Sequence, residues 1–302
     1  MKLASDADAV SPGLAPGVQP SASSGARGTL EPGHKARDDN VAAEGGKSSL
    51  FAAENIAISF GGIRAVDGVT FNVAEGEIFA IVGPNGAGKS TIFNLVSRIY
   101  EPTAGRLVFA GEDITRVPPH TIAGRGIART FQNIELFEHA TVLENLLIGR
   151  HCRSRPNVFA ELLFTPAVQR EELRHRTAVE EVIDFLDLAS YREQRISGLP
   201  YGVRKVVELA RALCAEPKLL LLDEPASGLN TEETEEVAYW IEDIKNDLGI
   251  TVIMIEHDMS LVSAVSDRVL ALNNGRMLAL GTPAEVQSNK AVIEAYLGSE
   301  TQ

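Results

Sequence analysis

The run GPNGAGKST, from Gly83 to Thr91, constrains this 302-residue chain more than any other feature of its sequence. It fits the pattern G-x-x-x-x-G-K-[ST], and it stands between the apolar run IFAIV and the helix-like TIFNLV. In that context the pattern predicts a loop whose backbone N–H groups surround a phosphate chain at the positive end of a helix. The competing interpretation, a glycine-rich turn that binds nothing, is disfavoured because the whole pattern is present in the required order.

This loop supplies most of the predicted ligands for a nucleotide and its metal ion. Lys89 is expected to reach the β- and γ-phosphates, and the Ser90 hydroxyl is expected to bind Mg²⁺. The predicted phosphate-binding positions are Gly83, Pro84, Asn85, Gly86, Ala87, Gly88, Lys89, Ser90 and Thr91.

Two carboxylates follow a second apolar run, LLLL at 219–222. Such a run is typical of a buried parallel strand, and open α/β sheets place their sites at the carboxyl ends of these strands. Asp223 is expected to hold Mg²⁺ through its water shell, and Glu224 to orient and deprotonate the attacking water. The alternative, a pair of solvated acids at a strand end, is disfavoured by the phosphate loop.

A third strand-like run, TVIMI at 251–255, precedes Glu256 and His257. His257 is a candidate for contacting the γ-phosphate. A single histidine after a strand is more often a hydrogen-bonded structural residue, so this hypothesis depends on the other motifs.

Together these elements resemble the ATP-binding-cassette (ABC) ATPases, the nucleotide-hydrolysing subunits of membrane transporters, over nearly all of residues 51–298. The resemblance implies an α/β fold, a P-loop NTPase cassette with a RecA-like core, an antiparallel β subdomain and a helical subdomain. It implies ATP as the nucleotide, Phe60 as the ring that stacks on adenine, and Gln132 as the link between Mg²⁺, water and the membrane partner. An ordinary core position for Phe60 and a solvated loop amide at Gln132 remain open. The implied catalytic residues are Glu224, His257, Gln132 and Lys89, and the implied metal ligands are Ser90, Gln132 and Asp223.

The signature segment of that family corresponds here to LPYGV, which is a degenerate match. The resemblance implies that Leu199, Tyr201 and Gly202 contact the ATP held by an opposite subunit. Pro200 replaces the usual serine and lacks a backbone N–H, and Asn230 stands where an aspartate is common. These two departures leave the hydrolytic rate and the symmetry of the two sites open.

Within the family, FGGIRAVDGVTF, TVLENLLIGRH and GTPAEVQSNKAVIEAYLG look most like branched-chain amino-acid importers. That implies permease subunits, a second ATPase that is a paralogue or an identical chain, an external substrate-binding protein, and a place on the cytoplasmic face of the plasma membrane. Import of urea or amides and export of lipopolysaccharide remain open. A non-transport cassette predicts two cassettes or a coiled-coil insertion, and a small-molecule kinase leaves Gln132, LPYGV and His257 unexplained.

Composition and net charge limit the other classes of protein to which this chain could belong. No apolar run reaches the roughly 18 to 20 residues that span a bilayer, so membrane association is expected to come through a partner. A formal net charge of −13 argues against nucleic-acid binding, although a local basic patch remains open. Cys152 and Cys214 lack metal-ligand spacing and are expected to be reduced thiols.

Composition also divides the chain. Residues 1–49 are rich in Ser, Gly, Ala and Pro and predict a disordered tail, with a mis-assigned start as the alternative. Residues 50–298 are the predicted ATPase domain, with a helical subdomain at about 135–198, and 299–302 are the end of the chain. An antiparallel pair is expected from 51–60 and 69–82, with a turn at Gly76, and one strand from 106–114. Helical periodicity covers 170–188, and Thr141 with Glu144 predicts a helix start.

Overall fold

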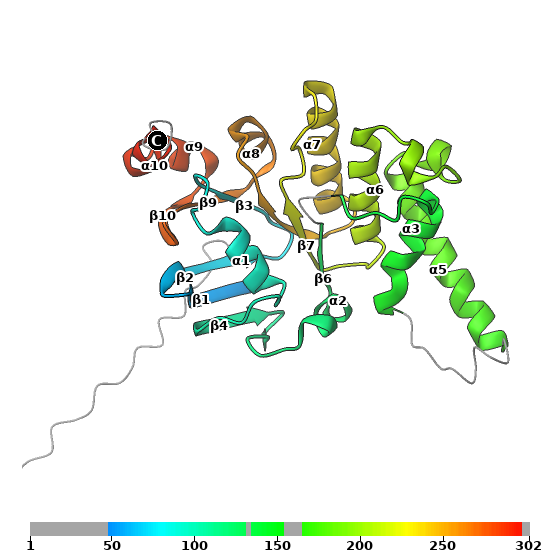
Figure 1. Cartoon of the computed structure of the whole chain (residues 1–302), viewed down its shortest axis with the longest axis horizontal. Coiled ribbons are helices and arrows are strands. Elements are labelled where there is room, and N and C mark those ends of the chain that lie inside the picture. The colour runs from blue at the N-terminus through cyan, green and yellow to red at the C-terminus, as the bar shows by residue number, and fades with distance from the viewer. Residues whose placement is uncertain (1–47, 131–133, 154–164, 298–302) are drawn as a thin grey trace, which may run out of the picture. The chain divides into compact units, whose positions relative to one another are not determined.

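The computed structural model describes residues 48–130, 134–153 and 165–297, and these belong to one compact unit (Figure 1). The predicted tail before Ser48, the predicted ligand Gln132 and the end of the chain lie outside the described residues. The predicted fold class is confirmed, because the described part has a central mostly parallel sheet, an antiparallel sheet and a helical region.

The larger sheet has the strand order β10-β9-β3-β8-β7-β6, and all its pairs except β10 with β9 are parallel. The predicted strands at 78–82, 219–222 and 251–255 are its three central members. They are completely buried, because each carries apolar side chains on both faces. The strands are β3 (Ile78–Val82), β6 (Ile127–Arg129), β7 (Leu219–Asp223), β8 (Thr251–Ile255), β9 (Arg268–Asn273) and β10 (Arg276–Gly281).

The smaller sheet is antiparallel, in the order β2-β1-β4-β5. The expected antiparallel pair is confirmed for 51–60 with 69–74, but its expected turn at Gly76 is wrong: the hairpin closes at Gly61 and Gly62, and Gly76 sends the chain into the other sheet. Residues 78–82 leave the hairpin because this strand, β3, carries apolar side chains on both faces and must be covered on both. The expected single strand at 106–114 is two short strands. The four strands are β1 (Ser49–Phe60), β2 (Ile63–Ala74), β4 (Ala104–Phe109) and β5 (Glu112–Asp113).

The helices cover both faces of the larger sheet. Thr141 caps α3 as predicted, in a reciprocal capping box with Glu144. The helix expected to reach residue 188 ends at Phe185, and Asp187 soon after it has a φ of 54°. The helices are α1 (Lys89–Val96), α2 (Ile122–Arg125), α3 (Val142–Gly149), α5 (Pro166–Phe185), α6 (Tyr201–Leu213), α7 (Thr231–Asn246), α8 (Met259–Val265), α9 (Pro283–Ser288) and α10 (Lys290–Leu297). Short 3-10 turns are η1 (Pro119–Thr121), η2 (Arg150–Arg153), η3 (Ala189–Tyr191) and η4 (Ile196–Gly198).

Strand alternation separates two apolar cores. Phe79 and Ile81 of β3 face a core that includes α1 and the antiparallel sheet, whereas Ile78, Ala80 and Val82 face a core that includes α3, α5, α6 and α7. The helix that follows the phosphate loop is therefore held between two sheets.

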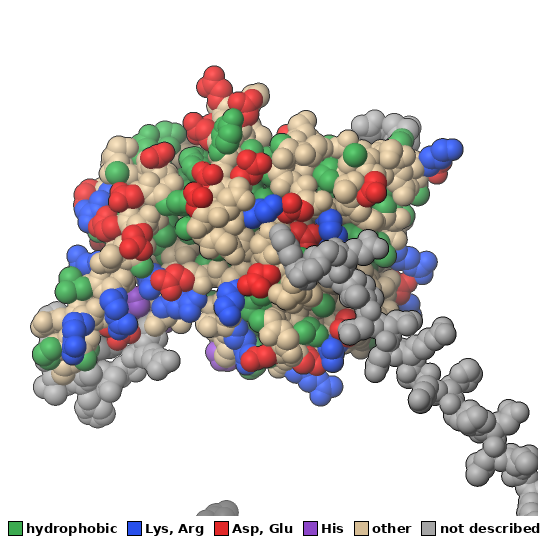
Figure 2. Space-filling view, turned by 180° about the vertical axis from the view of Figure 1, so that it is seen from behind, with side chains coloured by type: hydrophobic (Ala, Val, Ile, Leu, Met, Phe, Trp, Pro, Cys, Tyr) green, Lys and Arg blue, Asp and Glu red, His purple; other side chains and the backbone are tan. Residues whose placement is uncertain are grey.

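Charges of both signs lie on the surface. Figure 2 shows acidic side chains over the upper part of one face and a row of Lys and Arg side chains lower on it. In the part of the chain that the structure describes, no helix is long and apolar enough to cross a membrane.

Candidate nucleotide-binding and hydrolysis site

The phosphate loop connects β3 to α1 and keeps its backbone accessible. Gly86 has a φ of 80°, and a side chain at this position would have open space within 4 Å. At Gly88, with a φ of 102°, an added Cβ would lie 2.6 Å from the carbonyl oxygen of Ala65, so β2 closes one side of the loop. Gly88 precedes α1 without any side-chain cap, which leaves the first N–H groups of the helix to a ligand.

Lys89 lies inside this loop. Its Nζ donates to the carbonyl oxygens of Gly83 at 2.6 Å and Pro84 at 3.1 Å. Burial lowers the pKa of the Lys89 ammonium, and the charges of Glu224 and Asp223 oppose that change. The loop lysine and both predicted carboxylates are therefore close enough to interact electrostatically, as the sequence predicts.

Asp223 is the last residue of β7, and its side chain is only 5% exposed. Its Oδ2 accepts from Nη2 of Arg129 at 2.8 Å. No sequence motif predicts a role for Arg129, although this arginine stands three positions before the predicted ligand Gln132.

Glu224 has an unusual backbone conformation for a residue with a side chain, with a φ of 51°. This left-handed conformation costs of the order of 1–3 kcal/mol and is concentrated at functional sites. Hydrogen bonds hold this turn: Glu224 N–H donates to the carbonyl of Ile255 at 3.0 Å, and the Glu224 carbonyl accepts from Lys205 Nζ at 3.2 Å and from the N–H of Ser227 at 3.1 Å. The neighbouring strand and α6 therefore hold the predicted base in place.

His257 follows β8, the strand between β7 and β3, and its side chain is 61% exposed. The residue before it, Glu256, is buried and was given no role by the sequence. Glu256 accepts from the backbone N–H of His257 at 3.0 Å and from that of Ala226 at 3.0 Å. One buried carboxylate thus connects the histidine turn to the loop after Glu224.

The signature segment and the loop after Glu224 contact each other. The Tyr201 hydroxyl donates to the carbonyl of Ser227 at 3.3 Å, and the Tyr201 ring lies 3.1 Å from where a Cβ would be at Gly228. Asn230 caps α7 in a reciprocal capping box with Glu233, so the residue in place of the usual aspartate has a local structural role.

The residues at the start of α6 differ in exposure. Pro200 is the N-cap residue of the helix, with a φ of −56° and a ψ of 155°. The Leu199 side chain is 4% exposed and packs in the core, whereas Tyr201 is 48% exposed. Of these two predicted ligand contacts, Tyr201 therefore presents its side chain outwards and Leu199 does not.

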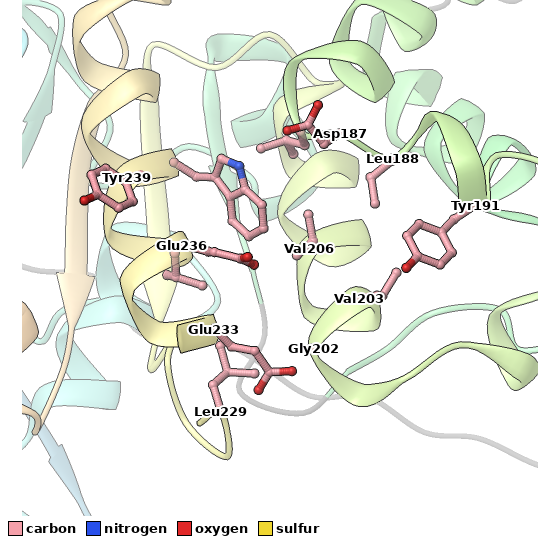
Figure 3. A pocket seen from close by; sticks show the side chains of 13 residues that line it. Asp187, Leu188, Tyr191, Gly202, Val203, Val206, Leu229, Glu233, Glu236 and Tyr239 are labelled. Atoms are coloured by element: carbon pink, nitrogen blue, oxygen red, sulfur yellow. The ribbon is translucent and has the colours of Figure 1, made fainter. Parts of the chain in front are cut away.

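A pocket of about 400 Å³ lies between α6 and α7, beside the signature segment. Figure 3 shows Glu233 of α7 pointing towards Gly202 at the start of α6, and an added Cβ at Gly202 would lie 2.4 Å from a carboxylate oxygen of Glu233. Trp240, Val206 and Leu229 also line this pocket. The pocket lies next to the signature segment and is not formed by the phosphate loop.

Phe60, the predicted adenine partner, is 44% exposed and packs edge-on against Tyr100 with ring centroids 5.1 Å apart. It ends β1, and the hairpin continues into β2, which carries Ala65 against the phosphate loop. This position keeps the ring accessible at that side of the loop. The adenine contact stays a prediction.

The donor set suits Mg²⁺, which prefers hard oxygen ligands from one or two carboxylates together with phosphates and water. Ser90 offers an exposed hydroxyl and Asp223 a carboxylate, while Gln132 lies outside the described residues. No group of three or more His, Cys, Asp or Glu side chains suited to a metal occurs among the described positions, so a closed site made only of these side chains is not found there.

Comparisons with known proteins agree with this geometry. The ABC transporter family profile matches residues 66–227, and that of the branched-chain amino acid ATP-binding cassette transporters matches residues 276–301. The high-affinity branched-chain amino acid transport ATP-binding proteins BraF of Pseudomonas aeruginosa and LivG of Salmonella typhimurium are each 39% identical over 249 residues, 82% of this chain and 98% of theirs.

A similar solved structure is the ADP conformation of MJ1267, an ATP-binding cassette of an ABC transporter. It is 32% identical with a TM-score of 0.74, and the match covers 83% of this chain and 99% of that one. With a matching family profile, relatives of nearly full length and the same fold, this chain belongs to the ABC transporter family as an ATP-binding ATPase subunit.

Proposed function

We propose that this chain binds MgATP and hydrolyses it to power import of branched-chain amino acids through partner permeases. The main supporting observation is that the phosphate loop and the pair Asp223 and Glu224 lie at the carboxyl ends of β3 and β7, two parallel strands on either side of β8. This arrangement supports phosphate binding and water activation at one edge of the larger sheet. The relatives named for branched-chain amino acid transport supply the substrate class.

In the proposed reaction the phosphate loop and Lys89 bind the β- and γ-phosphates, and Ser90, Asp223 and Gln132 hold Mg²⁺. The metal ion supplies charge neutralisation at the phosphates. Glu224 accepts the proton of the attacking water, because a carboxylate separate from the metal ligand is free to act as a base. His257 donates to the γ-phosphate from its exposed position.

The protein is proposed to act in a dimer of cassettes, with Tyr201 and Gly202 facing the ATP held by the other cassette. The second cassette is proposed to be a paralogue, and a substrate-binding protein delivers the amino acid outside the membrane. The docked permeases place the chain at the cytoplasmic face of the plasma membrane.

The test is ATP turnover by the chain assembled in liposomes with the permeases and second ATPase encoded beside it, with the matching binding protein added. We expect stimulation when that protein carries leucine, isoleucine or valine. Stimulation by urea or amides instead would replace the substrate class, and turnover independent of every such solute would favour export. The matched control is the same assembly with Glu224→Gln.

A further inference from the structure

Arg129 makes a buried ion pair with the predicted metal ligand. It is the last residue of β6, and its neighbour across the sheet is Leu221 of β7. The side chain extends to the end of β7, where Nη2 lies 2.8 Å from Oδ2 of Asp223. The two side chains are 12% and 5% exposed, so water does little to weaken this pair.

The same guanidinium also contacts the helix that follows the phosphate loop. Nη1 of Arg129 donates to Oδ1 of Asn94 at 2.6 Å and to the Ser97 hydroxyl at 3.2 Å. The group lies over the ring of Phe93, with 5.5 Å from its central carbon to the ring centroid. One planar side chain therefore joins the end of β7 to α1.

The geometry of arginine explains what this connection achieves. Its donors stand in a rigid planar fork, so fixing one side of the guanidinium on Asn94 also fixes the direction in which Nη2 points. The ion pair uses Oδ2 of Asp223, which leaves Oδ1 to accept from a metal-bound water. Without this partner the buried carboxylate would be unpaired and free to adopt another rotamer.

We infer that Arg129 is a positioning residue of the hydrolysis site, which fixes the Asp223 carboxylate relative to the phosphate loop so that one oxygen stays ready for Mg²⁺. This inference rests on the proposed role of Asp223 as a metal ligand. Arg129 itself touches neither nucleotide nor metal in this scheme.

The test measures how much Mg²⁺ strengthens nucleotide binding. The affinity of the full chain for a fluorescent ATP analogue is measured in EDTA and in excess Mg²⁺, and the ratio of the two is the metal gain. We expect Arg129→Gln to reduce the metal gain about tenfold and to leave the affinity in EDTA unchanged, because the phosphate loop is intact. Arg129→Lys keeps the charge but not the planar fork of donors, and its metal gain should be about threefold lower than that of the wild type.

Two further variants separate positioning from folding. Asn94→Ala removes the 2.6 Å hydrogen bond to α1 but keeps the Ser97 and Phe93 contacts and the ion pair, so it should lower the metal gain by about threefold in a stable chain. Arg125→Gln is the matched control, because Arg125 lies four residues earlier and pairs with the exposed Glu112. Its metal gain should equal that of the wild type.

Asp223→Asn completes a double-mutant cycle. If Arg129 acts through Asp223, the double variant should lose no more metal gain than the worse single variant. The inference would be overturned if folded Arg129→Gln kept the wild-type metal gain while Asp223→Asn lost it. If Arg129→Gln does not fold, Asn94→Ala replaces it in this comparison. A wild-type chain with no metal gain at all would overturn the proposed metal site as well.

Discussion

The phosphate side of the molecule (Gly83–Ser90, Asp223 and Glu224) and its signature side (Leu199–Gly202 and Ser227–Asn230) are built differently. On the phosphate side, Lys89 and Asp223 are buried and each already has hydrogen-bond partners inside the chain. On the signature side, Tyr201, Gly228 and Asn230 are exposed.

This difference shows which half of the chemistry one chain can organise alone. A buried charge needs partners fixed in advance, because leaving it unpaired is costly, and the phosphate side supplies them. The signature side presents surface groups held by local contacts, such as the capping box of Asn230 and the Tyr201 hydroxyl on Ser227. Substitutions on the first side should therefore change nucleotide binding or hydrolysis by a single chain, whereas those on the second should change ATP turnover only in an assembly.

The largest expected effect is at Glu224. Glu224→Gln should lower ATP turnover by about 10²- to 10⁴-fold, because the amide cannot accept the proton of the attacking water. ATP affinity should persist, since Lys89 and the loop are untouched. Turnover is measured by phosphate release, and Asp243→Asn, at an exposed position on α7, is the control. A normal rate in Glu224→Gln would remove the general-base role.

The next effect is expected on the signature side, at Gly202→Ala. The added Cβ would lie 2.4 Å from a carboxylate oxygen of Glu233 and would displace this side chain, which accepts from the Asn230 N–H in the capping box of α7. We expect a loss of about 1 kcal/mol in the free energy of unfolding, and a fall of about tenfold in turnover of the assembled transporter. ATP affinity of the isolated chain should not change, as equilibrium binding will show.

A background of Glu233→Ala is the matched control for this substitution. The hydrogen bond from the Asn230 N–H to the Glu233 side chain is already absent there, so Gly202→Ala should add little further loss of stability. Additive losses in urea unfolding would contradict the proposed contact, and a reduced ATP affinity in the isolated chain would contradict the separation of the two sides.

The sequence predicts the phosphate side better because its elements are consecutive residues. A buried apolar strand followed at once by the glycine-rich loop predicts β3, and one followed by polar side chains predicts β7 and β8; the structure confirms these three strands. Arg129 and Asp223 are 94 positions apart, and only the register of β6 against β7 brings them together. Glu256 and Ala226 are 30 positions apart, so their hydrogen bond also depends on the fold.

Smaller effects are expected at Tyr201. Tyr201→Phe removes the hydroxyl that donates to Ser227 but keeps the ring beside Gly228, so turnover of the assembled transporter should fall by about threefold or less. Tyr201→Ala also removes the ring contact, so its turnover should fall further. Both variants should bind ATP normally as isolated chains, measured with a fluorescent analogue. Equal turnover in Tyr201→Ala and the wild type would show that this contact does not connect the two segments.

The smallest effect is a pH dependence that originates at Lys89. Burial lowers the pKa of this ammonium below its usual 10.5, so the folded chain holds the proton less tightly than the unfolded chain. Between the lowered pKa and 10.5 the unfolded chain binds more protons, and the free energy of unfolding should therefore rise with pH across that window. Lys89→Met removes this contribution and should give a flatter profile of unfolding free energy against pH across the same window, as urea unfolding will show. Identical slopes of unfolding free energy against pH in the wild type and Lys89→Met would contradict this prediction. Saturating ATP should reduce the difference between the two slopes, because phosphate charge beside Lys89 stabilises its protonated form.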